Sequence, residues 1–377
     1  MVKNKKKLSN AGKFVKDLLL QADIQINGSR PWDMQVHSPK VFDRILAKAN
    51  LGLGEAYMEG LWDCERLDQF FNKILRAKLD QKIDPKKLLM HHIRVRFLNL
   101  QTKKRAFQVG EQHYDLGNDF YESMLDSRMT YTCGYWKEAQ TLEDAQAAKL
   151  DLICRKLQLK PGMRVLDIGC GWGSFMVYAA EHYDVHCVGV TISKEQAQYA
   201  QKKYPHLNLE FRLQDYRQIN EKFDCIVSVG MFEHVGRKNH RHYMEVAHRC
   251  LKDDGLFLLH TIGKNIAHFA PDPWIDRYIF PNGDLPALSQ VTRASEGLFV
   301  TEDLHNFGAD YDTTLMAWYQ NFEASWSQFE PELGETFYRM WRYYLLSCAG
   351  AFRAREIQLW QFVFSKNGVE DGYRKIT

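Results

Sequence analysis

The sequence lacks the long apolar run that a membrane-spanning helix requires. No stretch approaches the roughly 18 consecutive apolar residues that such a helix needs. The N-terminus carries four lysines within residues 3–7, but only the short apolar patch 18–20 follows them. That patch is shorter than the core of a secretory signal, and no small-residue cleavage site comes after it. We therefore expect a cytoplasmic protein.

Paired cysteines are also missing. The eight cysteines are spread singly along the chain, and no CxxC pair occurs. The spacing indicates neither a zinc site nor a thioredoxin-like redox motif. Several cysteines fall in apolar, strand-like segments, where cysteine acts as a small hydrophobic residue. We expect reduced thiols and no bound metal.

Excess charge is small overall but concentrated in one segment. The net charge is only +3, yet the stretch 73–105 contains eleven lysines and arginines against two acids, Asp80 and Asp84. Such a block suits a polyanion, either anionic lipid or nucleic acid. A solvated surface explains the charge equally well.

The pattern of apolar residues divides the chain into two unequal parts. Residues 1–90 are typical of a small, mainly helical domain, and the uneven distribution of charge leads us to expect that this domain docks on lipid or membrane. Within it we expect helices at 41–46 and 67–79 and a turn-rich break at 51–54. Residues 91–108 form a basic linker, and a catalytic domain is expected over residues 109–377.

From residue 141 onward, β-rich segments alternate with helical ones. Thr141 and Asp144 form a capping-box-like start to a helix that ends near residue 157. Helices are also expected up to residue 183, from residue 193, and near 241–250. The expected strands are 164–168, 186–191, 207–213, 223–229 and 256–262. This alternation predicts an α/β fold with a doubly wound, mostly parallel sheet.

A glycine-rich turn follows the first of these strands. Asp167 precedes three glycines, Gly169, Gly171 and Gly173, which let the backbone approach a ligand at the carboxyl ends of the strands. The GxGxG spacing differs from the dinucleotide fingerprint, and no Lys-Ser/Thr follows as a P-loop requires. An acid before the glycines suits an ammonium or hydroxyl group better than a phosphate. The turn therefore points to S-adenosylmethionine, with a merely structural turn as the alternative.

Seven sequence motifs occur in order along almost the whole chain. They are HYDLGND (113–119), YTCGYW (131–136), VLDIGCGWG (165–173), GVTIS (189–193), GMFEHVG (230–236), LHTIG (259–263) and NFGADY (306–311). In these motifs the chain closely resembles the bacterial cyclopropane-fatty-acyl-phospholipid synthases. The resemblance implies a class I S-adenosylmethionine-dependent methyltransferase with a small helical N-terminal domain.

The resemblance assigns residues to the S-adenosylmethionine site. The strand 186–191 lacks the terminal acid that commonly holds the ribose hydroxyls, and the family match supplies Thr191 and Gln196 instead. The other residues that the resemblance places in or beside the site are Tyr131, Thr132, Gly169, Gly171 and Ile192, with Gln214, Asp215 and Tyr216 near the adenine.

The resemblance also implies a bicarbonate ion that acts as the general base. It would be surrounded by Cys133, Glu233, His260, Tyr311 and the backbone of Ile262. Methyl transfer to an alkene leaves a carbocation, and ring closure requires a held base to remove a proton from the added methyl group. Water must be excluded, and aromatic faces can stabilise the cation.

The expected reaction transfers a methylene group from S-adenosylmethionine to the cis double bond of acyl chains in membrane phospholipids. We expect a peripheral protein of the inner membrane surface, and the family resemblance suggests a homodimer. The proline-rich segment 271–286 is either a cover for the acyl chain or a plain loop. Alternatives are fatty-acyl C-methylation without ring closure and N-methylation of a small amine. No nucleic-acid partner is expected, because Phe232-Glu233-His234 replaces the proline-rich loop of nucleic-acid amine methyltransferases.

Overall fold

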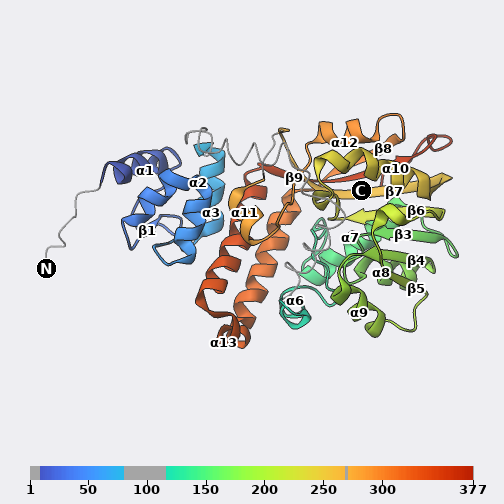
Figure 1. Ribbon diagram of the computed structural model, residues 1–377, viewed down its shortest axis with the longest axis horizontal. Coiled ribbons are helices and arrows are strands. Elements are labelled where there is room, and N and C mark those ends of the chain that lie inside the picture. Colours follow the sequence, from blue (N-terminus) through green and yellow to red (C-terminus); the bar gives the residue numbers. More distant parts are fainter. Residues whose placement is uncertain (1–8, 80–115, 268–270, 377) are drawn as a thin grey trace. The chain divides into compact units, whose positions relative to one another are not determined.

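The computed structural model describes residues 9–79, 116–267 and 271–376, and these group into two compact units (Figure 1). Unit 1 contains residues 9–79, 271–281 and 322–356, and unit 2 contains residues 116–267, 282–321 and 357–376. This grouping differs from a catalytic domain that runs without interruption from residue 109. The basic linker 91–108 lies outside the described residues.

Unit 1 is mainly helical. Its elements are α1 (Asn10–Gln21), β1 (Gln35–Val36), α2 (Lys40–Met58), β2 (Trp62–Asp63), α3 (Leu67–Arg76), α11 (Pro273–Tyr278) and the later part of α13 (Ala309–Arg353). The helices predicted at 41–46 and 67–79 are confirmed, although α3 ends at Arg76. The two halves of α13 meet at a break at Gly334, where φ is +72°.

The turn-rich break predicted at 51–54 is wrong. These residues lie inside α2, and the helix is interrupted instead at Ala49, whose φ is 48°. Gly54 is needed for close packing, because a Cβ there would lie 2.4 Å from Cδ1 of Trp274. A glycine that makes room for a neighbour is easily mistaken for a glycine that makes a turn.

The core of unit 1 joins segments that are distant in sequence. The Tyr343 ring on α13 lies 4.4 Å from Trp274 and 5.1 Å from Phe71, measured between ring centroids. Arg353 pairs with the buried Asp68 at 2.5 Å. Aromatic pairs of this kind bury large areas, so the N-terminal helices depend on α13 for their core.

Unit 2 is an α/β domain. Its strands are β3 (Arg164–Ile168), β4 (His186–Thr191), β5 (Leu209–Leu213), β6 (Phe223–Val229), β7 (Leu251–Lys264), β8 (Val300–Asn306) and β9 (Ile357–Ser365). Its α-helices are α6 (Asn118–Met124), α7 (Leu142–Lys156), α8 (Ser174–Tyr183), α9 (Lys194–Lys203), α10 (His240–Cys250), α12 (Leu288–Ser295) and the start of α13. The Thr141 cap is present, since its side chain accepts from the Asp144 N–H at 3.1 Å.

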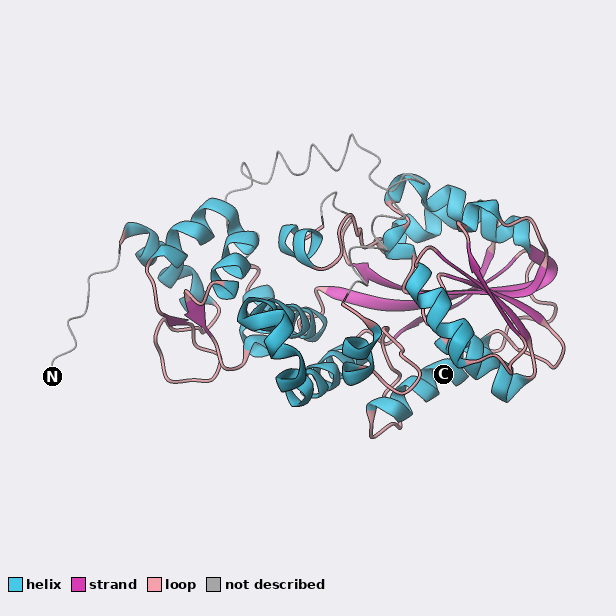
Figure 2. Ribbon diagram, turned by 60° about the horizontal axis from the view of Figure 1, so that its bottom comes forward, coloured by secondary structure: helices cyan, strands magenta, loops and turns pink. Residues whose placement is uncertain are grey.

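The seven strands form one sheet in the order β5-β4-β3-β6-β7-β9-β8. The first five strands of this order are parallel, while β9 runs antiparallel to both of its neighbours. Helices cover both faces of the sheet (Figure 2). Leu166 and Ile168 of β3 pack with α10 and α12, and Val165 packs with α7 and α8. The predicted doubly wound, mostly parallel fold is confirmed.

None of the helices in the described ranges combines the length and the apolar character needed to cross a membrane.

Candidate active site

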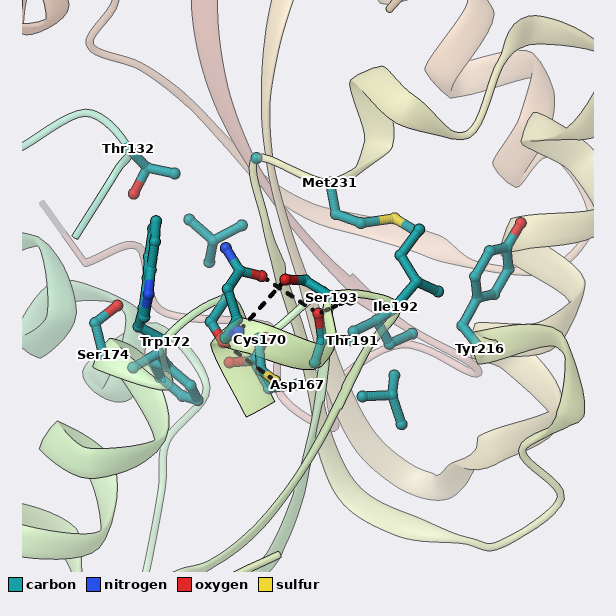
Figure 3. Close-up of a pocket in the computed structure, with 18 of the residues that line it drawn as sticks. Thr132, Asp167, Cys170, Trp172, Ser174, Thr191, Ile192, Ser193, Tyr216 and Met231 are labelled. Carbon is teal, nitrogen blue, oxygen red and sulfur yellow. Dashed lines mark hydrogen bonds between the residues drawn. The ribbon is translucent and has the colours of Figure 1, made fainter. Parts of the chain in front are cut away.

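A cavity lies at the carboxyl ends of β3, β4 and β6 (Figure 3). Eleven of the twelve residues predicted to bind or border S-adenosylmethionine line it: Tyr131, Thr132, Asp167, Gly169, Gly171, Thr191, Ile192, Gln196, Gln214, Asp215 and Tyr216. Such a position is where ligands bind in doubly wound sheets. The twelfth residue, Gly173, does not belong to the lining.

The glycine-rich turn is shaped by left-handed backbone conformations. Gly169 has φ +85°, and its N–H donates to the Val190 carbonyl at 2.9 Å, which joins the turn to β4. Gly173 begins α8 with φ +84°, and a Cβ there would lie 2.7 Å from the Phe211 ring. Gly173 therefore supports the turn from behind, while Gly169 and Gly171 form the wall of the cavity.

Thr191 and Gln196 come together at the end of β4, where the ribose acid is missing. Their side-chain oxygens lie 3.3 Å apart, and both residues are buried. Ser193 fixes the pair, because its N–H donates to Thr191 Oγ1 at 3.1 Å and its hydroxyl caps α9. The arrangement presents neutral polar groups where other sheets of this type present a carboxylate.

Asp215 is held by a residue that the sequence analysis did not single out. Its carboxylate receives two hydrogen bonds from the Arg217 guanidinium, at 2.8 and 2.6 Å, and also accepts from the Arg217 backbone N–H. Arg217 itself lines the cavity. With Asp215 neutralised in this way, Tyr216 and Gln214 supply the remaining surface on that side.

Lys149 is a second residue of the lining that the sequence analysis missed. It lies on α7 and is 1% exposed, and burial lowers its pKa to about 8. Burial raises the pKa of Asp167 to about 7, and the charge of Lys149 opposes that rise. The sequence carried one signal for the burial of Lys149: this residue lies three residues after the buried Gln146, at a core-facing position of α7.

Glu233, His260 and Ile262 meet beside the ends of β6 and β7. The Ile262 N–H donates to Glu233 Oε1 at 2.6 Å, and burial raises the pKa of Glu233 to about 7. Burial keeps the pKa of His260 well below its usual value, so its ring is neutral. Gln361 Nε2 lies 3.2 Å from His260 Nδ1, which places the ring proton on Nε2.

Cys133 and Tyr311 lie where the segment 131–136 meets the first turns of α13. Thr314 Oγ1 accepts from the Gly134 N–H at 3.0 Å and from Trp136 Nε1 at 2.9 Å. The Cys133 sulfur lies 3.9 Å from the same hydroxyl, and burial raises the pKa of its thiol. A neutral, buried thiol is a poor nucleophile.

The five predicted catalytic residues thus form two groups, and none lines the cavity itself. Phe307 links the groups, because its ring centroid lies 5.8 Å from that of His260 and 5.3 Å from that of Tyr135. The neighbours of Glu233, Met231 and His234, do line the cavity.

A series of aromatic rings connects the cavity to α13. Trp172 and Tyr131 line the cavity, and both contact Tyr121, at centroid distances of 5.1 and 5.4 Å. Tyr131 also packs on Trp318 at 5.1 Å, and Trp318 packs on Tyr311 at 5.9 Å. Aromatic faces along this path are suited to a cationic group.

The segment 271–286 is not a plain loop. It contains α11, and the backbone N–H of Asp284 donates to the Glu233 carbonyl at 2.9 Å. Lys264 pairs with the Asp284 side chain at 3.0 Å, which holds this part of the segment next to β7.

Across the described ranges, no three His, Cys, Asp or Glu side chains gather as metal ligands would.

The family described as mycolic acid cyclopropane synthetase matches residues 101–362 of the chain. The chain belongs to this family. It is 56% identical over 369 residues to the cyclopropane-fatty-acyl-phospholipid synthase of Escherichia coli (strain K12), covering 96% of this chain and 95% of that protein. The predicted family resemblance is confirmed.

Solved structures agree with this assignment. The cyclopropane synthase MmaA2 from Mycobacterium tuberculosis is 36% identical with a TM-score of 0.66, covering 71% of this chain and all of that chain. The mycolic acid cyclopropane synthase CmaA1 complexed with SAH and CTAB is 36% identical with a TM-score of 0.65, covering 69% and 98%. The fold of unit 2 is that of the class I S-adenosylmethionine-dependent methyltransferases.

Proposed function

We propose that this protein transfers a methylene group from S-adenosylmethionine to the cis double bond of unsaturated acyl chains in membrane phospholipids, forming a cyclopropane ring. The observation that carries the proposal is the buried pair of Glu233 and the Ile262 N–H beside a cavity at the carboxyl ends of the strands. The 56% identity to a phospholipid synthase over 96% of the chain supports the choice of substrate.

The cavity lining fits S-adenosylmethionine. Thr191 and Gln196 would hold the ribose, Tyr216 and Gln214 would border the adenine, and Asp167 would face the ammonium of the amino-acid part. Bound there, S-adenosylmethionine supplies an electrophilic methyl group. The alkene carbon forms the new bond while the bond from sulfur to the methyl group breaks, which leaves a carbocation on the acyl chain.

The second step removes a proton from the added methyl group, and the resulting electron pair closes the ring. The surroundings of Glu233 fit a small base. Three buried polar atoms there have no hydrogen-bond partner among the described residues: Glu233 Oε2, His260 Nε2 and Gln361 Oε1. Buried polar atoms are normally satisfied, so such a group indicates a polar guest. Bicarbonate, which both donates and accepts hydrogen bonds, matches this set.

Each residue of the base site has a part that its surroundings allow. His260 would donate from Nε2, and Glu233, with a pKa of about 7, can either donate or accept at Oε2. Cys133 and Tyr311 would complete the site from the side of α13. The aromatic rings that include Tyr131 and Trp318 would exclude water and stabilise the cation.

We also propose that the enzyme is peripheral at the inner surface of the cytoplasmic membrane and docks through its N-terminal region. On α1, Phe14 and Leu20 are 47% and 46% exposed, next to the exposed Lys13 and Lys16. Apolar and basic side chains on one helix suit the surface of an anionic bilayer.

The homodimer suggested by the family resemblance is tested by light scattering of the full-length protein.

The reaction is tested by incubating the protein with methyl-labelled S-adenosylmethionine and vesicles of an unsaturated phospholipid. Mass spectrometry of the released fatty acids should show one added CH2 per modified double bond as a cyclopropane ring. A methyl-branched product would replace the proposal with fatty-acyl C-methylation. Label on an added small amine would indicate N-methylation instead.

A further inference from the structure

Lys149 is a buried cation on the wall of the cavity. Among the described residues its ammonium makes one hydrogen bond, to Thr132 Oγ1 at 2.9 Å, and no carboxylate lies within 4.0 Å of it. An ammonium carries three N–H donors, so two of them have no partner in the protein. Burying a charge with so few hydrogen-bond partners is costly. Such a charged residue is retained where a ligand supplies the missing partners.

A role in holding the fold does not explain this lysine. Gln146, one turn earlier on α7, already fixes the same segment by donating to the Thr132 carbonyl at 2.7 Å. The nearby Asp126 is satisfied by the Thr130 N–H at 2.7 Å and the Thr130 hydroxyl at 3.1 Å. An apolar side chain at position 149 would fill the space without the cost of a buried charge.

The charges of the cavity wall match an α-amino acid. Lys149 and Asp167 both line the cavity, one positive and one negative. Thr132, which holds Lys149, lies on the opposite side of the cavity from Tyr216 (Figure 3). S-Adenosylmethionine likewise carries its carboxylate and ammonium at the end away from the adenine.

We propose that Lys149 binds the carboxylate of the amino-acid part of S-adenosylmethionine on the Thr132 side of the cavity. The inference rests on the proposed function, since it assigns a residue within the S-adenosylmethionine site. A charge-assisted hydrogen bond in a buried site is strong and directional, so Lys149 fixes where the sulfur, and with it the methyl group, is held.

The test compares three ligands that differ only in the amino-acid part. S-Adenosylhomocysteine carries the carboxylate, its decarboxylated analogue retains only the ammonium, and 5′-methylthioadenosine has neither group. By titration calorimetry, the wild type should prefer S-adenosylhomocysteine over the decarboxylated analogue by about tenfold to a hundredfold. In Lys149→Met the ratio of these two affinities should fall close to one, and the affinity for 5′-methylthioadenosine should be retained.

The matched control is Arg155→Met, which removes an exposed cation from the same helix and should keep the preference unchanged. A second variant, Lys149→Gln, provides the same test if the Lys149→Met protein does not fold. A preference retained in the Lys149 variants would overturn the inference. If the wild type bound none of the three ligands, the proposed function would fail as well, so the two failures are distinguishable.

Discussion

The backbone N–H of Ile262 donates to Oε1 of Glu233 at 2.6 Å, while Oε2 of the same carboxyl group is buried without a partner among the described residues. One oxygen fixes the side chain and the other is available to a guest. A carboxyl group held in this way can orient a small base without itself reaching the substrate. The electrostatic cost of that arrangement makes Glu233 a sensitive point for both activity and stability.

Replacing Glu233 with glutamine should lower turnover by about 100-fold or more, because the site loses its titratable oxygen. Binding of S-adenosylhomocysteine should be retained, since Glu233 does not line the cavity. Steady-state rates with unsaturated phospholipid vesicles and titration calorimetry measure the two effects. The control is Glu245→Gln, an exposed acid on α10. Equal loss of binding and turnover would contradict the assigned role.

The same variant should be more stable than the wild type at pH 8. Burial raises the pKa of Glu233 from 4.5 to about 7, so the folded protein holds this proton more tightly than the unfolded chain. Stability from this group is therefore greatest below pH 4.5 and is lost as the pH rises to about 7. The full difference is about 3 kcal/mol. Urea unfolding should show Glu233→Gln gaining stability at pH 8 and little at pH 5. A gain of equal size at both pH values would argue against an ionised, buried Glu233.

Two glycines of the turn should respond differently to alanine. Gly171→Ala meets no atom within 4 Å, so its cost in stability should be about 1–2 kcal/mol from its positive φ, with a marked loss of ligand affinity. Gly173→Ala adds a clash with Phe211 and should cost about 1–3 kcal/mol more, with a smaller direct effect on the ligand. Thermal unfolding and calorimetry with S-adenosylhomocysteine measure both. A larger loss of stability in Gly171→Ala, together with a larger loss of ligand affinity in Gly173→Ala, would contradict the places assigned to the two glycines.

Neutralising the basic segment should weaken binding to anionic vesicles and make the remaining binding less dependent on salt, because each surface cation contributes a screened attraction. Residues 80–105 of this segment lie outside the described residues, so this prediction rests on the sequence. The variant replaces Lys86, Lys87, Arg94 and Arg96 with glutamine. The control replaces four exposed lysines of unit 2: Lys160, Lys194, Lys202 and Lys238. Vesicle cosedimentation at two salt concentrations would refute docking by this segment if both variants bound like the wild type.

The central strands were predictable because parallel strands buried on both faces are continuous apolar runs. β3, β4 and β6 lie at the residues predicted for them. β7 starts at Leu251, five residues before the predicted start, since Leu251 pairs with Phe223 although polar residues follow it. β9 was not predicted, because its place between β7 and β8 depends on pairing with strands far away in the sequence.

The candidate site was predictable where it follows strand ends, and less so where it depends on helix faces. Thr191 is the last residue of β4, Gln196 lies in the first turn of α9, which follows β4, and Glu233 lies four residues after the end of β6, so their positions follow from the sheet. Lys149 faces inward from α7, but lysine in a helix is normally exposed, so its core-facing position in the helix was a weak signal and the three-dimensional packing was needed to show its burial. Arg217 was missed because its interaction with Asp215 depends on the local turn.

Unit 1 has a consequence for how the chain folds during synthesis. Its N-terminal helices pack on residues 322–356, which leave the ribosome after nearly all of unit 2 has been made. Until then Phe71 and Tyr57 lack the ring of Tyr343, and their apolar surfaces stay open to other partners. Contacts between residues so far apart in the sequence form late, and the unfinished core meanwhile exposes apolar surface of the kind that favours aggregation.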